Sequence, residues 1–130
     1  MVKSAIQANR HPAGPGPELM GASTVTGDTV CNADGEKLGE IKEIMLDTQT
    51  GRVAYAVLSF GGFLGLGDKL FAIPWAVLKL DPDRQRFVLD VEKERLERAP
   101  GFDKSRWPMM ADLTWAAEIH DYYRVTPYWQ

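Results

Sequence analysis

The sequence predicts a mostly β protein: a small β-barrel of about six strands with a short helix and an aromatic-rich helical extension at the C-terminal end. The first observation is a series of short runs, rich in Thr, Val, Ile and aromatic residues, separated by turn residues from Gly21 to about Val91. The second is a change after Val91 to charged and then apolar residues at helical spacing. Strands this short and close together favour a barrel, because closure removes the edges that a flat sheet exposes.

The first two strands are expected on either side of an Asp-Gly turn. Residues 24–32 are rich in Thr and Val, and the turn after them contains Gly35, which can adopt positive φ. The next run, residues 37–46, carries apolar residues at a spacing that would also suit a helix. Gly39 and the β-rich neighbours favour a strand with a bulge.

A hairpin is predicted where the turn at residues 47–51 leads into a strand over residues 52–60. Apolar residues occupy both faces of that strand: Val53, Tyr55 and Val57 on one, and Ala54, Ala56, Leu58 and Phe60 on the other. Such a strand is covered on both sides. One face can line the barrel, and the other is expected to meet the C-terminal segment or a second copy of the chain.

The remaining strands are expected at residues 69–74, 77–80 and 86–89. The last two form a hairpin, because Pro82 supplies the φ of about −65° that its turn requires. Apolar residues of all these strands are predicted to fill the barrel. They are Ile41, Ile44, Leu46, Val53, Tyr55, Val57, Phe71, Ile73, Leu78, Leu80, Phe87 and Leu89.

Helices are predicted after the barrel. Residues 92–98 are expected to form a short charged helix that ends before Pro100-Gly101. Asp112 is a candidate N-cap for a helix over residues 113–123. The apolar face of this helix comprises Trp115, Ile119 and Tyr122.

The C-terminal segment is unusually aromatic. The aromatic residues after Pro100 are Phe102, Trp107, Trp115, Tyr122, Tyr123, Tyr128 and Trp129. A disordered tail would not carry so many large apolar rings. The segment is therefore expected to pack on the barrel or across a dimer.

Three regions follow from these patterns. Residues 1–20 contain alternating Pro and Gly, which prevent helix and sheet alike, and are expected to form a flexible leader. Residues 21–98 form the barrel domain. Residues 99–130 form the aromatic-rich extension.

The composition disfavours several function classes. The chain has 15 basic and 18 acidic residues and a net charge of −3, whereas nucleic-acid-binding domains usually carry a basic excess. No apolar run approaches the ~20 residues that span a bilayer, and no signal-like run opens the sequence. Cys31 is the only cysteine, so no internal disulfide can form, and it is expected to be a buried hydrophobe. These observations predict a cytoplasmic protein.

The order of the motifs resembles the PRC-barrel domain family over about residues 21–100. The motifs are the run at residues 34–41, the hairpin at residues 46–55, and the Gly-rich run at residues 60–69 that leads into Ala72-Ile73-Pro74-Trp75. The resemblance implies a small barrel of six or a similar number of strands. The family includes the cytoplasmic part of the photosynthetic reaction centre H subunit and the C-terminal domain of a ribosome maturation factor. The ending at residues 122–129 is similar to the tails of stand-alone bacterial members.

The candidate binding residues are apolar. The Gly-rich loop at residues 61–68 fits neither dinucleotide nor P-loop glycine spacing, and a strand follows it rather than a helix. Its apolar residues either fold back on the barrel or form a tip for protein contact. The candidate partner-binding residues are the apolar residues of this loop and aromatic residues of the extension: Phe63, Leu64, Leu66, Trp107, Trp115, Tyr128 and Trp129.

No catalytic, cofactor-binding or metal-binding residue is predicted. Acidic residues are scattered over turns, where they usually bond their own backbone. The Asp47–Gly51 turn lacks the ligand spacing of a calcium loop. His120 precedes Asp121 on the late helix but has no candidate nucleophile or metal-ligand cluster around it in the sequence, so a surface histidine is expected.

The sequence therefore favours a non-catalytic adaptor or scaffold that binds an unknown protein and forms a homodimer. The alternative is an RNA- or ribosome-associated factor, by resemblance to the maturation-factor branch of the family. Salt-dependent binding to RNA would separate the two hypotheses.

Overall fold

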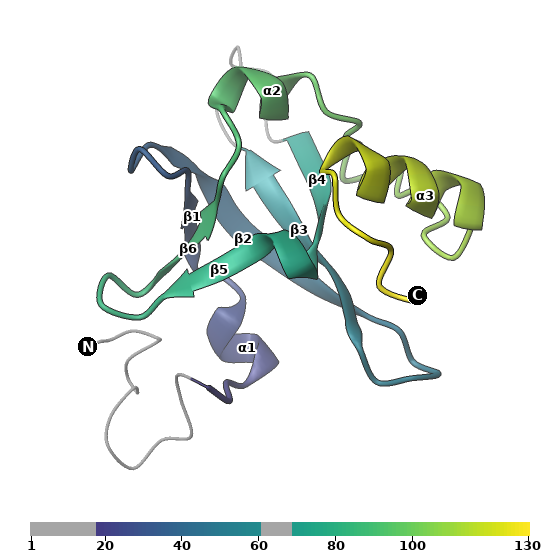
Figure 1. Cartoon of the computed structure of the whole chain (residues 1–130), viewed down its shortest axis with the longest axis horizontal. Coiled ribbons are helices and arrows are strands. Elements are labelled where there is room, and N and C mark those ends of the chain that lie inside the picture. Colours follow the sequence, from purple (N-terminus) through teal and green to yellow (C-terminus); the bar gives the residue numbers. More distant parts are fainter. Residues whose placement is uncertain (1–17, 61–68) are drawn as a thin grey trace.

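The structure, a computed structural model, describes residues 18–60 and 69–130. The sequence-based fold class is confirmed: six strands form one curled sheet, a half-barrel, in the order β4-β3-β2-β1-β6-β5 (Figure 1). The strands are β1 (Thr29–Cys31), β2 (Lys37–Leu46), β3 (Val53–Phe60), β4 (Lys69–Pro74), β5 (Leu78–Asp81) and β6 (Arg86–Leu89). The helices are α1 (Ala22–Val25), the 3-10 turn η2 (Trp75–Val77), α2 (Lys93–Glu97) and α3 (Leu113–Tyr122).

The start of the described chain differs from the expected strand over residues 24–32. Residues 22–25 form the single helical turn α1, which buries Val25, and β1 spans only three residues. Gly27 has φ of 96° between them, and its N–H donates to the carbonyl of Ile41 at 2.7 Å. Val25 is buried as part of a helical turn rather than of a strand. The Thr- and Val-rich composition of residues 24–32 therefore did not specify a strand over the whole run.

Strand β2 carries the irregularities that bend the sheet. Its pairing with β3 shifts register between Ile41 and Glu43 and again between Met45 and Leu46. A bulge re-aims the side chains that follow it. The prediction that Leu46 lies in the barrel is wrong for this reason, since its side chain is 56% exposed.

Gly39 of β2 is needed for a close approach of the backbone. A Cβ atom at this position would lie 2.1 Å from the carbonyl oxygen of Ser59 on β3, far inside van der Waals contact. Its partner on the other side is Val30 of β1, with a register shift between Val30 and Cys31. Glycine at this point therefore lets β2 pass close to β3.

The β5–β6 hairpin forms as expected, with the turn between Asp81 and Arg86 closed by Gln85 at φ of 53°. Strand β6 also pairs in parallel with β1, through Val30↔Phe87 and Cys31↔Val88. This pairing joins the hairpin to the rest of the sheet. Leu78 and Leu80 of β5 are only half-buried, because β5 lies at the edge of the sheet.

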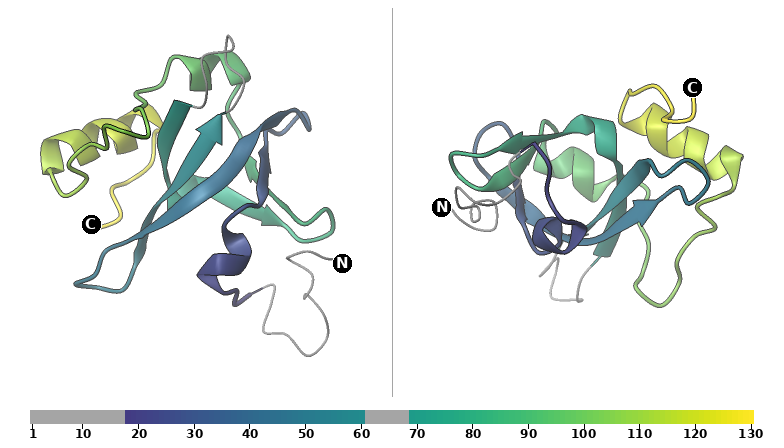
Figure 2. Two further views of the ribbon diagram at one scale, coloured as in Figure 1. Left: turned by 180° about the vertical axis from the view of Figure 1, so that it is seen from behind. Right: turned by 90° about the horizontal axis from the view of Figure 1, so that it is seen from below.

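Both faces of β3 are covered within one chain. Tyr55 lies 5.5 Å from Trp115 and 5.5 Å from His120, ring centroid to ring centroid, so α3 covers the face that bears Tyr55. Figure 2 shows α3 and the C-terminal segment together on one side of the sheet. A second copy of the chain is not needed to cover this strand.

The hydrophobic core spans the sheet and both later helices. Of the predicted barrel residues, Val57 is 0% exposed, whereas Ile44 and Val53 are only half-buried. The large side chains that are less than 2% exposed include several outside the predicted set: Leu38, Leu58, Leu70, Leu96 and Ile119. Helices α2 and α3 therefore contribute to the same core as the strands.

Candidate functional site

The predicted partner-binding residues fall into separate places. Phe63, Leu64 and Leu66 lie outside the described residues. Trp107 packs its ring against Phe102 at a centroid distance of 5.0 Å, and its Nε1 donates to the carbonyl of Lys104 at 2.9 Å. Trp115, Tyr128 and Trp129 are instead gathered around Tyr55 and His120.

This second group forms an aromatic cluster between β3, α3 and the C-terminal tail, residues 124–130. The ring of Tyr128 lies 6.1 Å from Tyr55 and 5.9 Å from His120, and Trp129 lies 5.2 Å from both His120 and Tyr128. Most of these pairs meet edge to face, the arrangement that aromatic quadrupoles prefer. The cluster attaches the tail to the sheet.

Polar contacts fix the tail at the base of the β2–β3 hairpin. The guanidinium of Arg52 donates to the carbonyl oxygen of Tyr128 at 2.6 Å. In Figures 1 and 2 the hairpin projects from the sheet with the C-terminal end beside it. Tyr128 is thereby held at a defined position between the hairpin and α3.

The turn of this hairpin presents an ionised carboxylate. Asp47 Oδ1 accepts hydrogen bonds from the backbone N–H groups of Gln49 at 2.9 Å and Thr50 at 3.3 Å. These donors, Gln49 first, hold the pKa of the Asp47 carboxyl below its ordinary value of 3.8. The same residue borders the groove that the tail and the hairpin enclose.

This groove, which we term the tail groove, has a volume of about 480 Å³. Three parts of the chain form it: the β2–β3 hairpin, the residues at the start of α3, and the tail. The residues that line it are Met45, Leu46, Asp47, Thr48, Gln49, Ala54, Tyr55, Met110, Ala111, Leu113, Tyr128 and Trp129. It brings Tyr128 and Trp129 together with residues that the sequence had not indicated, above all Met45, Met110 and Leu113.

Those residues carried only a weak signal in the sequence. Met110 lies two residues before the Asp112 cap of α3 and Leu113 is the first residue of the helix, so neither belongs to the apolar stripe that identifies the helix. Their juxtaposition with Met45 depends on how α3 docks against the hairpin. Sequence spacing does not contain that information.

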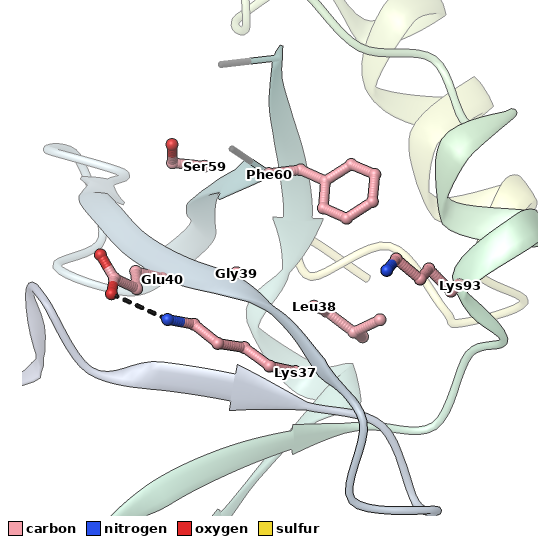
Figure 3. Close-up of a pocket in the computed structure, with 7 residues that line it drawn as sticks. All are labelled: Lys37, Leu38, Gly39, Glu40, Ser59, Phe60 and Lys93. Carbon is pink, nitrogen blue, oxygen red and sulfur yellow. Dashed lines mark hydrogen bonds and ion pairs between the residues drawn. The ribbon is translucent and has the colours of Figure 1, made fainter. Parts of the chain in front are cut away.

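A second hollow lies at the other end of β2 and β3 (Figure 3). It has a volume of about 420 Å³ and is lined by Lys37, Leu38, Gly39, Glu40, Ser59, Phe60 and Lys93. Lys37 Nζ pairs with Glu40 Oε2 at 3.2 Å, and Lys93 Nζ lies 4.0 Å from Glu36 Oε2. Both ammonium groups thus have a carboxylate neighbour, so the hollow offers no excess positive charge for an anion.

For two potentially reactive side chains, Cys31 and His120, the burial in the structure can be compared with the burial expected from the sequence. Cys31 is 4% exposed, as expected of a buried hydrophobe. The prediction of a surface histidine is wrong, because His120 is 1% exposed. Its position one turn after Ala116 places the ring against β3 and beneath the tail, so tertiary packing buries a residue whose neighbour Asp121 is exposed.

Within residues 18–60 and 69–130, no group of three or more His, Cys, Asp or Glu side chains is placed to hold a metal ion. Polar side chains in the turns bond to the backbone of their own turn. Asn32 Oδ1, for example, accepts hydrogen bonds from the backbone N–H groups of Asp34 and Glu36 at 3.1 and 2.9 Å. None of the helices in this part of the chain is long and apolar enough to cross a membrane.

Comparison with known proteins points to one family. The PRC-barrel domain family matches residues 17–96 of the chain. No curated protein matches the chain. Among solved structures, a similar chain from Pseudomonas aeruginosa is assigned as a 16S ribosomal RNA processing protein, RimM, with 17% sequence identity and a TM-score of 0.39. The match covers 64% of this chain and 49% of that one, so this chain spans about half the length of the protein it resembles.

Proposed function

This chain belongs to the PRC-barrel domain family, and we propose that it is a non-catalytic binding module that holds an amphipathic helix of a partner protein in the tail groove. The observation that carries the proposal is the apolar surface left open there. Leu46 is 56% exposed and Leu113 is 64% exposed, and both line the groove. Exposed apolar patches on folded proteins usually mark interaction sites.

The lining favours an α-helix as the occupant. Met45 and Met110 supply flexible thioether side chains, which adapt to the apolar ridge of a helix. Met109 extends the apolar surface next to Met110 and is 77% exposed. An amphipathic helix laid into an apolar groove is a recurring mode of peptide recognition.

The charge at the groove favours a basic residue beside the apolar face of that helix. The Asp47 carboxylate lies on the lining and accepts hydrogen bonds from neutral donors, among them the backbone N–H groups of Gln49 and Thr50 and the side chain of Tyr128. It has no basic partner among the ion pairs of the described residues. A Lys or Arg of the partner would complement it, with an effect mainly on association rate and specificity. We also propose that the protein acts in the cytoplasm. The free thiol of Cys31 is compatible with that compartment, because cytosolic thiols are kept reduced.

The test is photo-crosslinking in cells of the native host, with a photoreactive residue in place of Gln49 at the groove. It is carried out in the wild-type background and in Leu46→Asp and Leu113→Asp backgrounds. Leu19→Asp is the matched control, because Leu19 is 71% exposed and does not line the groove. We expect one protein to be crosslinked in the wild-type and Leu19→Asp backgrounds and at least about tenfold less in the groove variants.

Other outcomes would assign other functions. A crosslink to a second copy of this chain, with a concentration-dependent dimer in sedimentation, would make the groove a homodimer interface. A crosslink that survives both groove substitutions would contradict the proposal. Recovery of RNA whose binding falls steeply with salt would support the RNA-associated alternative instead.

A further inference from the structure

A turn that usually contains glycine closes the end of α3. The backbone N–H of Val125 donates to the carbonyl of His120 at 3.0 Å, and that of Arg124 donates to the carbonyl of Asp121 at 3.1 Å. Such a pair of bonds ends many helices, and the residue after the cap is then left-handed and most often Gly. Here that residue is Arg124, with φ of 57°. Its conformation is strained, because a Cβ atom crowds the following carbonyl oxygen in the left-handed region.

Arg124 sets the direction of the tail. With this residue left-handed, the chain turns back from α3 (Figure 1), and Tyr128 and Trp129 reach the rings of Tyr55 and His120 of the same copy. With Arg124 in the right-handed conformation that is ordinary for Arg, α3 would continue and the tail would leave along the helix axis. One strained residue therefore decides whether the tail stays on its own copy.

The groups that hold the tail lie outside the tail itself. The Arg52 guanidinium donates to the Tyr128 carbonyl oxygen at 2.6 Å, and the Asp47 carboxylate accepts a hydrogen bond from the Tyr128 hydroxyl. The rings that the tail packs on belong to Tyr55 and His120, and each of these residues is 1% exposed. A second copy of the chain presents the same four groups, so its site fits this tail as closely as the tail's own site does.

We propose that two copies of the chain form a dimer by exchanging their tails across a two-fold axis. Each Arg124 adopts the right-handed conformation, and each tail occupies the site on the other copy. The exchange keeps the contacts of both tails and relieves the strain at two residues, and exchange of an identical element is a low-cost route to a dimer. Tyr128 lies four residues beyond Arg124, so each α3 ends within about 14 Å of the site that its tail enters. The inference does not rest on the binding of a helix in the tail groove, since an exchanged tail forms the same wall of that groove.

Substitutions of Arg124 test the role of its conformation. Its side chain is exposed, so Arg124→Gly and Arg124→Val remove the same charge and differ in backbone preference. Glycine adopts the left-handed region without strain, whereas a β-branched residue is a rare occupant of it. Sedimentation equilibrium of the full chain measures the dissociation constant of the dimer. Because two residues change per dimer, we expect this constant to be at least about tenfold higher for Arg124→Gly than for the wild type, and at least about threefold lower for Arg124→Val.

Crosslinking identifies the copy that holds each tail. Gln49 lines the tail groove at the hairpin turn, and Gln130 follows Trp129, which lines the same groove; both glutamines are exposed. The double variant Gln49→Cys/Gln130→Cys is separated into monomer and dimer fractions and treated with a short bismaleimide. We expect links within one chain in the monomer fraction and links between two chains in the dimer fraction. Leu19→Cys/Gln130→Cys is the matched control and should give far fewer links, because Leu19 is exposed but does not line the groove.

Other results would overturn the proposal. A dimer whose links all stay within one chain would show association without exchange of tails. Equal dissociation constants for Arg124→Gly and Arg124→Val would show that the conformation of this residue has no part in association. A chain that stays monomeric up to about 1 mM would exclude the dimer. None of these results bears on the tail groove, whose occupant is tested separately by crosslinking to other proteins in cells.

Discussion

Arg95 of α2 and Tyr122 of α3 are joined by three reciprocal contacts. The Tyr122 hydroxyl donates to the backbone carbonyl of Arg95 at 2.6 Å, and the Arg95 guanidinium donates to the backbone carbonyl of Tyr122. The guanidinium also lies over the Tyr122 ring, 4.2 Å from its centroid. These contacts hold the helix that bears His120 against the helix that follows the sheet.

The first prediction concerns this pair. Tyr122→Phe keeps the ring and loses one hydrogen bond, so we expect the free energy of unfolding to fall by about 1 kcal/mol. Arg95→Ala removes the cation–π contact and the charged donor, and we expect a loss of about 2–4 kcal/mol. Urea denaturation measures both. Arg98→Ala, at an exposed position one turn on, is the control and should change stability by less than about 0.5 kcal/mol.

The second prediction tests the faces of the sheet. Val57→Asp buries a carboxylate at a position that is 0% exposed, and we expect it to cost more than about 4 kcal/mol and to unfold the domain. Leu46→Asp places the same group on β2 after the register shift, where the side chain is exposed, and should leave the fold intact. Circular dichroism and thermal melting compare the two variants. Equal stability would show that the register of the β2–β3 pair is wrong.

The third prediction concerns the approach of β2 to β3. Gly39→Ala would place a methyl carbon 2.1 Å from the Ser59 carbonyl oxygen, so the strands must move apart. We expect a loss of at least about 2 kcal/mol in the free energy of unfolding. Gly21→Ala is the control, because the added carbon would lie at an ordinary 3.6 Å from Thr24 Oγ1. A neutral Gly39→Ala variant in the same denaturation assay would rule out the close approach.

The fourth prediction concerns alkaline pH. Burial raises the pKa of Tyr55 and Tyr123 well above the ordinary value of 10.0. A group with a raised folded-state pKa contributes stability that is fully present below the unfolded pKa and is lost as pH rises toward the folded one. The free energy of unfolding should therefore be insensitive to these groups up to about pH 10 and fall above it.

Phenylalanine variants check this assignment. Tyr55→Phe and Tyr123→Phe, together, should flatten the decline in unfolding free energy above pH about 10. At neutral pH Tyr55→Phe should be close to neutral, because the Tyr55 hydroxyl is among the buried groups without a hydrogen-bond partner in the described part of the chain. An unchanged alkaline slope in the double variant would contradict the assignment.

Local signals were sufficient for most strands and for α3. Asp112, for example, is predicted as an N-cap because it is an Asp directly before the apolar residues of the helix. In the structure its carboxylate accepts a hydrogen bond from the backbone N–H of Thr114 at 2.9 Å. The hairpins form where turn-forming Asp, Pro and Gly residues separate the predicted strands. Such features depend on residues a few positions apart, which is why a single sequence reveals them.

The failures have a common physical origin in long-range packing. Leu46 is grouped with Ile41 and Ile44 in the predicted core, but a register shift before it turns the side chain outward. His120 is predicted at the surface because the sequence shows no partner for it, whereas in the folded chain Tyr55 of β3 and Trp129 of the tail both pack against its ring. The candidate groove could not be predicted for the same reason, since Met45 and Leu113 meet only in the folded chain.

The place of β1 in the sheet has a consequence for how the chain acquires its structure. β1 is three residues long and lies between β2 and β6, the last strand in the sequence. Until Phe87 and Val88 have been synthesised, one edge of β1 lacks the strand with which it pairs. Completion of the sheet therefore waits for the pairing of distant segments, which is slower than formation of local contacts. During that interval Val30 and Cys31 present an open edge, the point at which nascent chains are most exposed to pairing with one another.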